Sequence, residues 1–485
     1  MNRRFIVILV VALACAAAAV SMYIVRLNVT ALRQHAGELG VGVSFSGLRP
    51  AARGVVFTDA ILHRPGSFDL YLVAPALRAG QHDDAWSIAM AGALMHLFGP
   101  WYSLPSGLVH RTEFRFGEGR VLFDGEVDTP SFVIDTPRIH GRPLVWKDLL
   151  FTFSGRVDKA TSTLTLDRGS VRKDDASVDM SGSWRLGFAA RPVNLVFQSR
   201  DLSGDQVRRL LPRILTTRLG DVRFGGRLGV SLRMYAAEMP TTPVRVALDI
   251  DNKLSVTGLA APFALEPLVS NFSWQVYDTA GGSIRHDSGP ASPGWCPLDA
   301  IPPAFTNAAV ALVDPLFPIH RGISPHAMAQ NLERELNGYG NTNTAETITE
   351  RLAATLWPLP GTGLRRRVEL AILATHLEQS LDKPTLLALY LNTADFGHGI
   401  RGIGEAARHL CHKAPRDLTA CECVLLALSL ADPSRPVVDL AGHALPAVVP
   451  AARAQLESLL QRSIITDEQF QAALAELGPD PTATQ

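Results

Sequence analysis

The chain has 485 residues, and its 46 Lys and Arg balance 46 Asp and Glu. One hydrophobic core rarely serves a chain of this length, so two or three domains are expected. Because the charge is balanced, the chain has no general basic field of the kind that attracts nucleic acid. We therefore expect no nucleic-acid partner. Plentiful glycine and proline, 39 and 32 residues, suit a protein rich in strands and turns.

The N-terminus carries Arg3 and Arg4 before an uncharged, mostly apolar run over residues 5–25. About 20 such residues cross a bilayer core as a helix, and flanking basic residues stay in the cytoplasm. The sequence therefore predicts a cytoplasmic stub and transmembrane anchor over 1–26. A cleaved signal peptide is the alternative, because Ala14–Ala19 offers small-residue cleavage sites, although its apolar region is normally shorter.

Short runs of alternating polar and apolar residues fill the region 27–277. This period-two pattern predicts antiparallel strands. The strand candidates are 120–124, 149–153, 162–166, 178–186, 193–198, 228–234 and 244–250, and a short helix is expected over 206–211. The stretch 169–211 resembles the β-repeats of AsmA-like inner-membrane proteins. The resemblance implies an elongated periplasmic sheet near the membrane, and a plain packing scaffold is the alternative.

The stretch Trp86–Tyr102 is strongly apolar and has aromatic residues at its ends. It is too short and too interrupted for a second membrane span. We predict a core helix that packs against the sheet. The alternative is a segment at the bilayer interface, where Trp and Tyr are favoured.

Turn-forming residues without apolar periodicity predict a linker over 278–296. Apolar residues at helical spacing then predict a helical domain over 297–440 and a helical tail over 441–485.

Four cysteines lie outside the anchor: Cys296, Cys411, Cys421 and Cys423. A Cys-x-Cys pair without a second pair or a histidine set is a weak zinc signature, so no metal site is predicted. Two interpretations stay open. Cys411 pairs with Cys421 or Cys423 in an oxidising compartment, or all of them are small buried thiols.

Five short stretches between Ala311 and Lys413 carry a family resemblance: A-L-V-D-P-L-F-P-I-H-R-G, T-A-E-T-I-T-E-R-L-A, R-R-R-V-E-L, K-P-T-L-L-A-L-Y-L-N and G-I-G-E-A-A. In this order and spacing they resemble the lipid II polymerase domain of peptidoglycan glycosyltransferases, glycosyltransferase family 51. The resemblance implies a mainly α, lysozyme-like domain. The predicted fold class is α+β and multidomain, in a single-pass protein of the bacterial inner membrane with most of the chain in the periplasm.

The first family motif is E-D-x-x-F-x-x-H-x-G, and its glutamate is the base that deprotonates the acceptor sugar. The matching residues here are Val313, Asp314, Phe317, His320 and Gly322. Val313 has no titratable group, and losing a positioned base typically costs ~10²–10⁴ in rate. Asp314 is no ready substitute, because neighbouring helical residues point about 100° apart.

The second motif, G-G-S-T-I-T-Q-Q, keeps Thr347 and Thr349 but gains the acids Glu346 and Glu350. These acids would repel a pyrophosphate. In the third motif, R-K-x-x-E, the ungapped alignment uses Arg366 and Arg367 and places Leu370 at the second catalytic glutamate, with Glu369 one position early. The alternative is a one-residue gap that restores Glu369, but it would rotate the rest of the helix against its core.

The last motifs, from Lys383 to Asn392 and over 396–407, match the family closely. The resemblance thus implies substrate-binding residues without intact catalytic acids. The candidate binding residues are His320, Thr347, Thr349, Arg366, Arg367, Lys383 and Asn392.

Three functions remain open. The leading hypothesis is a catalytically impaired protein that binds lipid II, glycan or a cell-wall synthesis protein. The second is an active, divergent transglycosylase with a replacement acid from Asp314, Glu346, Glu350 or Glu369; only this activity would call for a divalent cation, and no other cofactor is expected. The third is a lipid-handling or scaffolding protein that acts through its β-rich domain.

Overall fold

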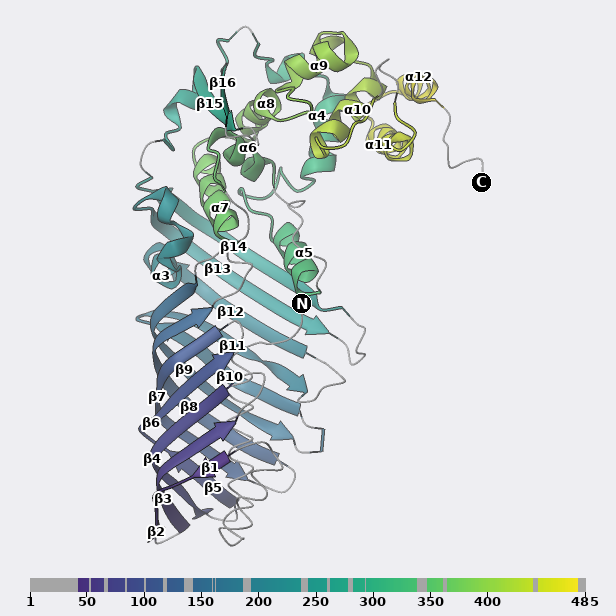
Figure 1. Cartoon of the computed structure of the whole chain (residues 1–485). Helices are drawn as coiled ribbons and strands as arrows, with labels where there is room; N and C mark the ends of the chain where they lie inside the picture. Colours follow the sequence, from purple (N-terminus) through teal and green to yellow (C-terminus); the bar gives the residue numbers. More distant parts are fainter. Residues whose placement is uncertain are drawn as a thin grey trace.

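The protein consists of a long antiparallel sheet with a helical domain at one end (Figure 1). The computed structural model describes residues 42–51, 54–64, 69–82, 85–99, 102–116, 120–134, 143–158, 160–161, 163–185, 193–236, 243–259, 262–277, 282–292, 294–337, 347–360, 364–438 and 444–478. The predicted anchor over 1–26 lies outside these residues. No helix in the described ranges is both long and apolar enough to cross a membrane.

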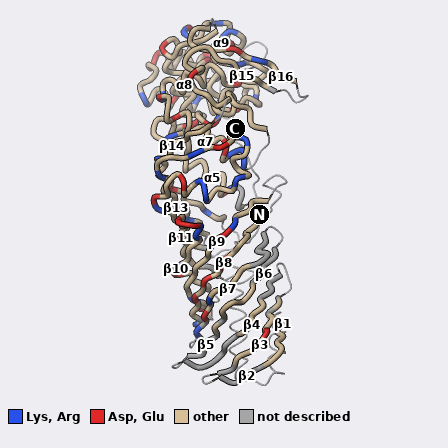
Figure 2. Tube along the Cα trace, turned by 90° about the vertical axis from the view of Figure 1, so that its left-hand side faces the viewer, with Lys and Arg blue, Asp and Glu red and all other residues tan. Residues whose placement is uncertain are grey.

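The sheet has fourteen strands, and each is antiparallel to its neighbours. Their order is β1-β3-β4-β5-β7-β8-β9-β10-β11-β12-β13-β14, with β2 beside β3 and β6 between β4 and β7. The strands are β1 (Gly42–Ser44), β2 (Gly47–Ala51), β3 (Gly54–Arg64), β4 (Asp69–His82), β5 (Ala85–Met90), β6 (Ala93–Gly99), β7 (Tyr102–Phe116), β8 (Arg120–Ile134), β9 (Leu144–Asp158), β10 (Thr163–Lys173), β11 (Ala176–Arg185), β12 (Val193–Ser203), β13 (Arg223–Ala236) and β14 (Arg245–Thr257). Turned by 90°, the sheet forms a narrow column below the helical domain (Figure 2).

The alternating pattern predicted the seven strands β8–β14 correctly, because one face of the sheet is buried. In β10 the burial alternates through Leu164 and Leu166, and in β9 through Phe153 and Gly155. The predicted short helix is α3 (Gly204–Leu210), which begins at the capping box of Ser203 and Gln206.

The helix predicted over Trp86–Tyr102 is wrong, because this stretch contains β5, β6 and the start of β7. Gly92, at φ +66°, separates β5 from β6 in a conformation that interrupts a helix. β6 is then hydrogen-bonded to β4 and β7 on its two edges. A short apolar run fits a buried strand as well as a helix. Here pairing with the neighbouring strands makes the segment a strand.

The helical domain begins with the hairpin β15 (Phe272–Tyr277) and β16 (Ser283–Ser288). Its helices are α4 (Pro303–Val313), α5 (Pro325–Leu336), α6 (Ile348–Leu356), α7 (Leu364–Glu378), α8 (Lys383–Thr393), α9 (Ile403–Cys411), α10 (Ala420–Ala431), α11 (Val449–Gln461) and α12 (Asp467–Leu477). The segment expected as a linker over 278–296 therefore contains a strand, and its last residue, Cys296, is buried.

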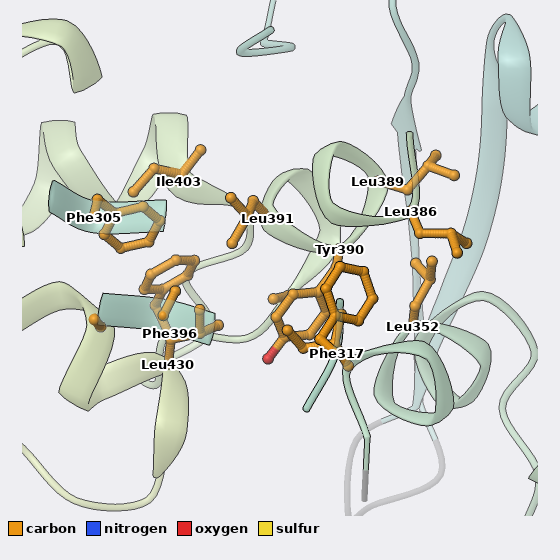
Figure 3. Packing of buried hydrophobic residues seen from close by; sticks show 14 of the residues in the cluster. Phe305, Phe317, Leu352, Leu386, Leu389, Tyr390, Leu391, Phe396, Ile403 and Leu430 are labelled. Atoms are coloured by element: carbon orange, nitrogen blue, oxygen red, sulfur yellow. The ribbon is translucent and has the colours of Figure 1, made fainter. Parts of the chain in front are cut away.

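One hydrophobic core joins the helical domain to the end of the sheet. Phe305 and Phe396 stack with ring centroids 6.3 Å apart, and Phe317, Tyr390 and Leu352 pack beside them (Figure 3). The same cluster includes Phe224 of β13 and Val256 of β14. The end of the sheet and the helical domain thus bury apolar surface against each other.

The last strand of the sheet, β14, has its outer edge covered by side chains from helices. The Asn337 amide accepts from the Val244 N–H at 2.8 Å and donates to the Val244 carbonyl at 2.9 Å. Gln379 does the same for Val256, at 2.7 Å in both directions. Glu333 accepts from the Val246 N–H at 2.7 Å. These groups occupy the places of a neighbouring strand and so protect the edge from pairing with another chain.

We expect Gln379→Ala to speed amide hydrogen exchange at Val256, since both of its backbone groups lose their partner. The local opening free energy should fall by about 1–2 kcal/mol. Exchange followed by mass spectrometry measures this, and Asn337→Ala is the matched control because it should act at Val244 only. Unchanged exchange at Val256 would contradict the role of Gln379.

Candidate functional site

The first-motif loop, between α4 and α5, is built around Asp314. Asp314 ends α4 and is buried; its Oδ2 accepts from the Ile348 N–H at the start of α6, at 2.9 Å. His320 Nε2 lies 2.9 Å and 3.0 Å from the two carboxylate oxygens. An ionised carboxylate only accepts, so Nε2 carries the proton. The Asp314 carboxylate therefore holds the loop to α6 and is already occupied by two donors.

Gly322 and Thr347 close the same loop. Gly322 adopts φ +81°, and a Cβ there would come within 2.9 Å of the Ala374 backbone, so glycine is required. Thr347 Oγ1 donates to the Gly322 carbonyl at 2.8 Å and also receives the Glu350 N–H as the cap of α6. The Glu350 carboxylate accepts from the Thr347 N–H at 3.0 Å. Glu350 thus serves as the third residue of a capping box.

A second buried carboxylate, Glu378, lies at the end of α7. Its Oε1 accepts from Thr349 Oγ1 at 2.5 Å and from Lys383 Nζ at 2.8 Å. Lys383 Nζ also donates to the His320 carbonyl at 2.7 Å and lies 4.3 Å from the centre of the Phe317 ring. The structure therefore brings together His320, Thr349 and Lys383, three of the predicted binding residues. Sequence reasoning missed Glu378, for which the only signal was an acid five residues before Lys383.

The start of α7 is tied to the sheet region by the fully buried Glu369. Its carboxylate lies 3.1 Å from Arg365 Nε and 3.3 Å from Arg218 Nη1, which belongs to the segment between α3 and β13. Arg218 also donates to the Pro360 carbonyl, and Arg365 donates to Thr217 Oγ1 at 2.5 Å. Glu369 thus joins two regions that are 151 residues apart.

The remaining predicted residues occupy different surroundings. Leu370 is almost fully buried in the core, where a carboxylate would lose its hydration without a partner. Arg366 and Arg367 are half-buried on the first turn of α7. Glu346 lies outside the described residues. Asn392 is buried and brackets the backbone of Cys296, accepting from its N–H and donating to its carbonyl, both at 2.8 Å, which is a packing role.

The four cysteines in the described residues, Cys296, Cys411, Cys421 and Cys423, are free thiols. Cys411 and Cys421 line one cavity of about 180 Å³ together with Glu422 and Glu476. Burial, followed by the nearby carboxylates, raises the pKa of Cys411 and of Cys421 to about 12. In the described part of the chain, no three His, Cys, Asp or Glu side chains come together as a metal site.

We expect these thiols to react with iodoacetamide far more slowly at pH 8 than a free cysteine, because the thiolate is the nucleophile and a pKa of about 12 leaves little of it. Reactivity should increase as the pH is raised toward 12, before alkali unfolds the chain. Mass-spectrometric counting of alkylated sites checks this, with urea-unfolded protein as the control. Rapid labelling of Cys411 in the folded chain would contradict it.

The helical domain is similar in sequence to known proteins. Residues 283–447 match the family model described as Transglycosylase. Biosynthetic peptidoglycan transglycosylases of Shewanella denitrificans and Shewanella frigidimarina are 38% and 36% identical to this chain over 144 residues, which is 30% of this chain and 62% and 63% of theirs. That of Yersinia pseudotuberculosis is 33% identical over 142 residues, 29% of this chain and 58% of its own. The chain thus spans about three fifths of the length of these curated relatives, and its sheet lies outside the match.

Proposed function

From the match of residues 283–447 to the transglycosylase family model, we propose that this protein binds lipid II or peptidoglycan glycan and polymerises it poorly or not at all. The observation that carries the proposal is Val313, which stands where the family resemblance places the base. Its side chain packs against the core and has no proton acceptor.

The described candidate acids are all engaged elsewhere, which supports this proposal. Asp314 holds His320 and the Ile348 N–H, Glu350 caps α6, and Glu369 lies between two arginines. A general base needs a carboxylate within reach of the acceptor hydroxyl. Each of these acids would first have to leave a buried or capping partner, at the cost of that interaction.

Several groups needed for binding are kept. Lys383 is held by Glu378 beside Phe317, and Arg366 and Arg367 lie on the first turn of α7, where guanidinium groups suit phosphate oxygens. His320 Nδ1 is buried and has no hydrogen-bond partner among the described residues. This nitrogen is available to a ligand hydroxyl or a water, as an acceptor in the neutral imidazole and as a donor in the imidazolium.

The test is a paired measurement on the full chain in lipid vesicles. We expect the chain to bind lipid II or a moenomycin-like phosphoglycolipid, more weakly after Arg366→Ala or Arg367→Ala, and to form little or no glycan polymer from lipid II. Robust glycan chains that are abolished by Arg367→Ala would overturn the proposal. Absence of any binding to lipid II, phosphoglycolipid and glycan would overturn it as well.

The membrane placement is part of the same proposal. We place residues 1–26 as a single-pass anchor in the bacterial inner membrane, from the uncharged run over 5–25, with the rest of the chain in the periplasm. There the chain would meet lipid-linked precursors and cell-wall synthesis proteins. Resistance of the full chain to alkaline extraction from membranes tests the anchor, and release into the soluble fraction would contradict it.

An active, divergent transglycosylase is the second candidate, with a divalent cation expected only in this case. It requires one of Asp314, Glu346, Glu350 or Glu369 to act as the replacement base. Alanine at that position would then end polymerisation while the chain still folds. If all four alanine variants polymerised lipid II like the parent chain, this candidate would fail.

A lipid-handling role for the sheet is favoured by one observation: uncharged residues, five of them apolar and two of them glycines, follow one another across its buried face. Each is directly paired with the next, over the seven strands from β8 to β14: Phe123, Gly155, Leu166, Gly182, Leu195, Met234 and Val246. Such a row could hold acyl or polyprenyl chains, as an AsmA-like protein would. Photo-cross-linking of lipid from a benzophenone side chain placed at Met180, on this face, would support the role, and absence of lipid adducts there would remove it.

A further inference from the structure

Four apolar residues form a row on the other face of the sheet, near its N-terminal end. Ile61 pairs with Val73, Val73 with Leu94, and Leu94 with Leu108. Directly paired residues of antiparallel strands point to the same face. Ile61, Leu94 and Leu108 are 39%, 45% and 37% exposed. We call Ile61, Val73, Leu94 and Leu108 the apolar row.

The opposite face of the same strands is already filled. Each residue of the apolar row has a neighbour in sequence that is almost fully buried: Ala60, Ala74, Ala93 and Val109. Successive residues of a strand point to opposite faces. A strand with one face against protein normally presents polar residues on the other. At the row, strands β3, β4, β6 and β7 are therefore apolar on both faces, and within the described part of the chain the row stays exposed.

This apolar character is confined to one end of the face. Residues 85–110 contain no Asp, Glu, Lys or Arg. The row is bounded by Ser44 on β1 and Asp128 on β8. Beyond it the same face carries ion pairs such as Arg111 with Asp124 and Arg156 with Asp167, and Figure 2 shows charged residues gathered along β9–β13. A water-facing surface thus begins where the row ends.

The end that carries the row is also the end connected to the membrane-length run. Ser44 of β1 pairs directly with Ile61, and 16 residues, 26–41, separate the run over 5–25 from β1. Sixteen residues reach at most about 55 Å, whereas β14 lies about ten strand spacings, roughly 50 Å, farther away than β3. With the run over 5–25 in the membrane, as proposed above, the row therefore stays within reach of the bilayer, whereas β14 need not.

We propose that the apolar row is a membrane-contact surface that rests on the boundary between headgroups and acyl chains. The proximity of the bilayer rests on the anchor in the proposed function, while the contact itself rests on the row. Apolar side chains on a polar-rimmed face bind this boundary as amphipathic surfaces do. The contact lays the N-terminal end of the sheet against the membrane and leaves the charged end of the face in water.

The test uses the full chain with vesicles of phosphatidylethanolamine and phosphatidylglycerol. A benzophenone side chain replaces Leu94, Leu108 or, as the distant control on the charged end of the same face, Asp249. After illumination we expect lipid adducts at positions 94 and 108 several-fold above those at 249. Equal yields at the three positions would overturn the proposal, as would adducts to residues 1–41 or to a second copy of the chain in place of lipid.

A charge placed in the row gives an independent readout that does not depend on large structural change. Leu94→Glu should strongly reduce the lipid adducts formed at position 108. Leu122→Glu is the matched control, because Leu122 is 49% exposed on the same face but pairs with Arg115 and Arg156. If both variants reduced the adducts equally, the contact would not belong to the row. Alkaline extraction reports separately on the anchor, so loss of the anchor and loss of the contact are distinguishable.

Discussion

The variant Val313→Glu is expected to polymerise lipid II at least ~100-fold faster than the parent chain, because it supplies the positioned general base that Val313 lacks. The position suits the change. Val313 is the last residue of α4 and is only partly buried, so a carboxylate there can remain hydrated. The loop that follows is already held by Asp314, His320 and Gly322. The initial rate of glycan-chain formation from fluorescent lipid II, with the full chain in vesicles, measures the effect.

The control for this gain is Val313→Gln, which has the same shape as glutamate but takes no proton at neutral pH. It should polymerise no faster than the parent. Adding Arg367→Ala to Val313→Glu should reduce the gain if Arg367 binds the substrate phosphate, as proposed. A folded Val313→Glu variant that stays as slow as the parent would contradict the proposal that the missing base at position 313 limits the reaction.

Most of the sheet could be predicted from the sequence, because burial on one face imposes the period-two pattern that β9 and β10 display. The pattern failed where both faces are apolar. At Trp86–Tyr102 no alternation was available, and the choice between helix and strand depended on pairing with β4 and β7. That pairing is a property of distant segments, which local periodicity does not contain.

The candidate site divides in the same way. The loop that joins Asp314, His320 and Gly322 is local, and the first motif marked all three residues. The roles of Glu369 and Glu378 could not be read from spacing, because each has a partner from elsewhere in the chain: Arg218 for Glu369 and Thr349 for Glu378. The ungapped alignment made Glu369 a displaced acid, whereas its buried carboxylate is bound to Arg218, a residue of the sheet region that carries no motif signal.

The second large effect concerns the ion pairs of Glu369 with Arg218 and Arg365, which connect α7 to the sheet region. We expect Glu369→Ala to lower the free energy of unfolding by about 3 kcal/mol, toward the lower end of what loss of one partner of a buried ion pair costs. Glu369 is fully buried, whereas the side chains of Arg218 and Arg365 are 29% and 27% exposed. Water can therefore hydrate the two guanidinium groups in the variant and offset part of the lost stability. Urea unfolding of the full chain, followed by circular dichroism, measures the change.

Two further variants separate a structural role of Glu369 from a catalytic one. Arg218→Ala should destabilise the chain less than Glu369→Ala, because Arg365 still neutralises the carboxylate. Glu369→Gln keeps the shape and one acceptor but loses the charge, so its stability should fall between Glu369→Ala and the parent. If Glu369→Ala unfolded like the parent chain but lost all lipid II polymerisation, Glu369 would be the replacement acid of a divergent enzyme. A loss of stability that Arg218→Ala shares in part would instead identify Glu369 as the residue that fastens the helical domain to the sheet.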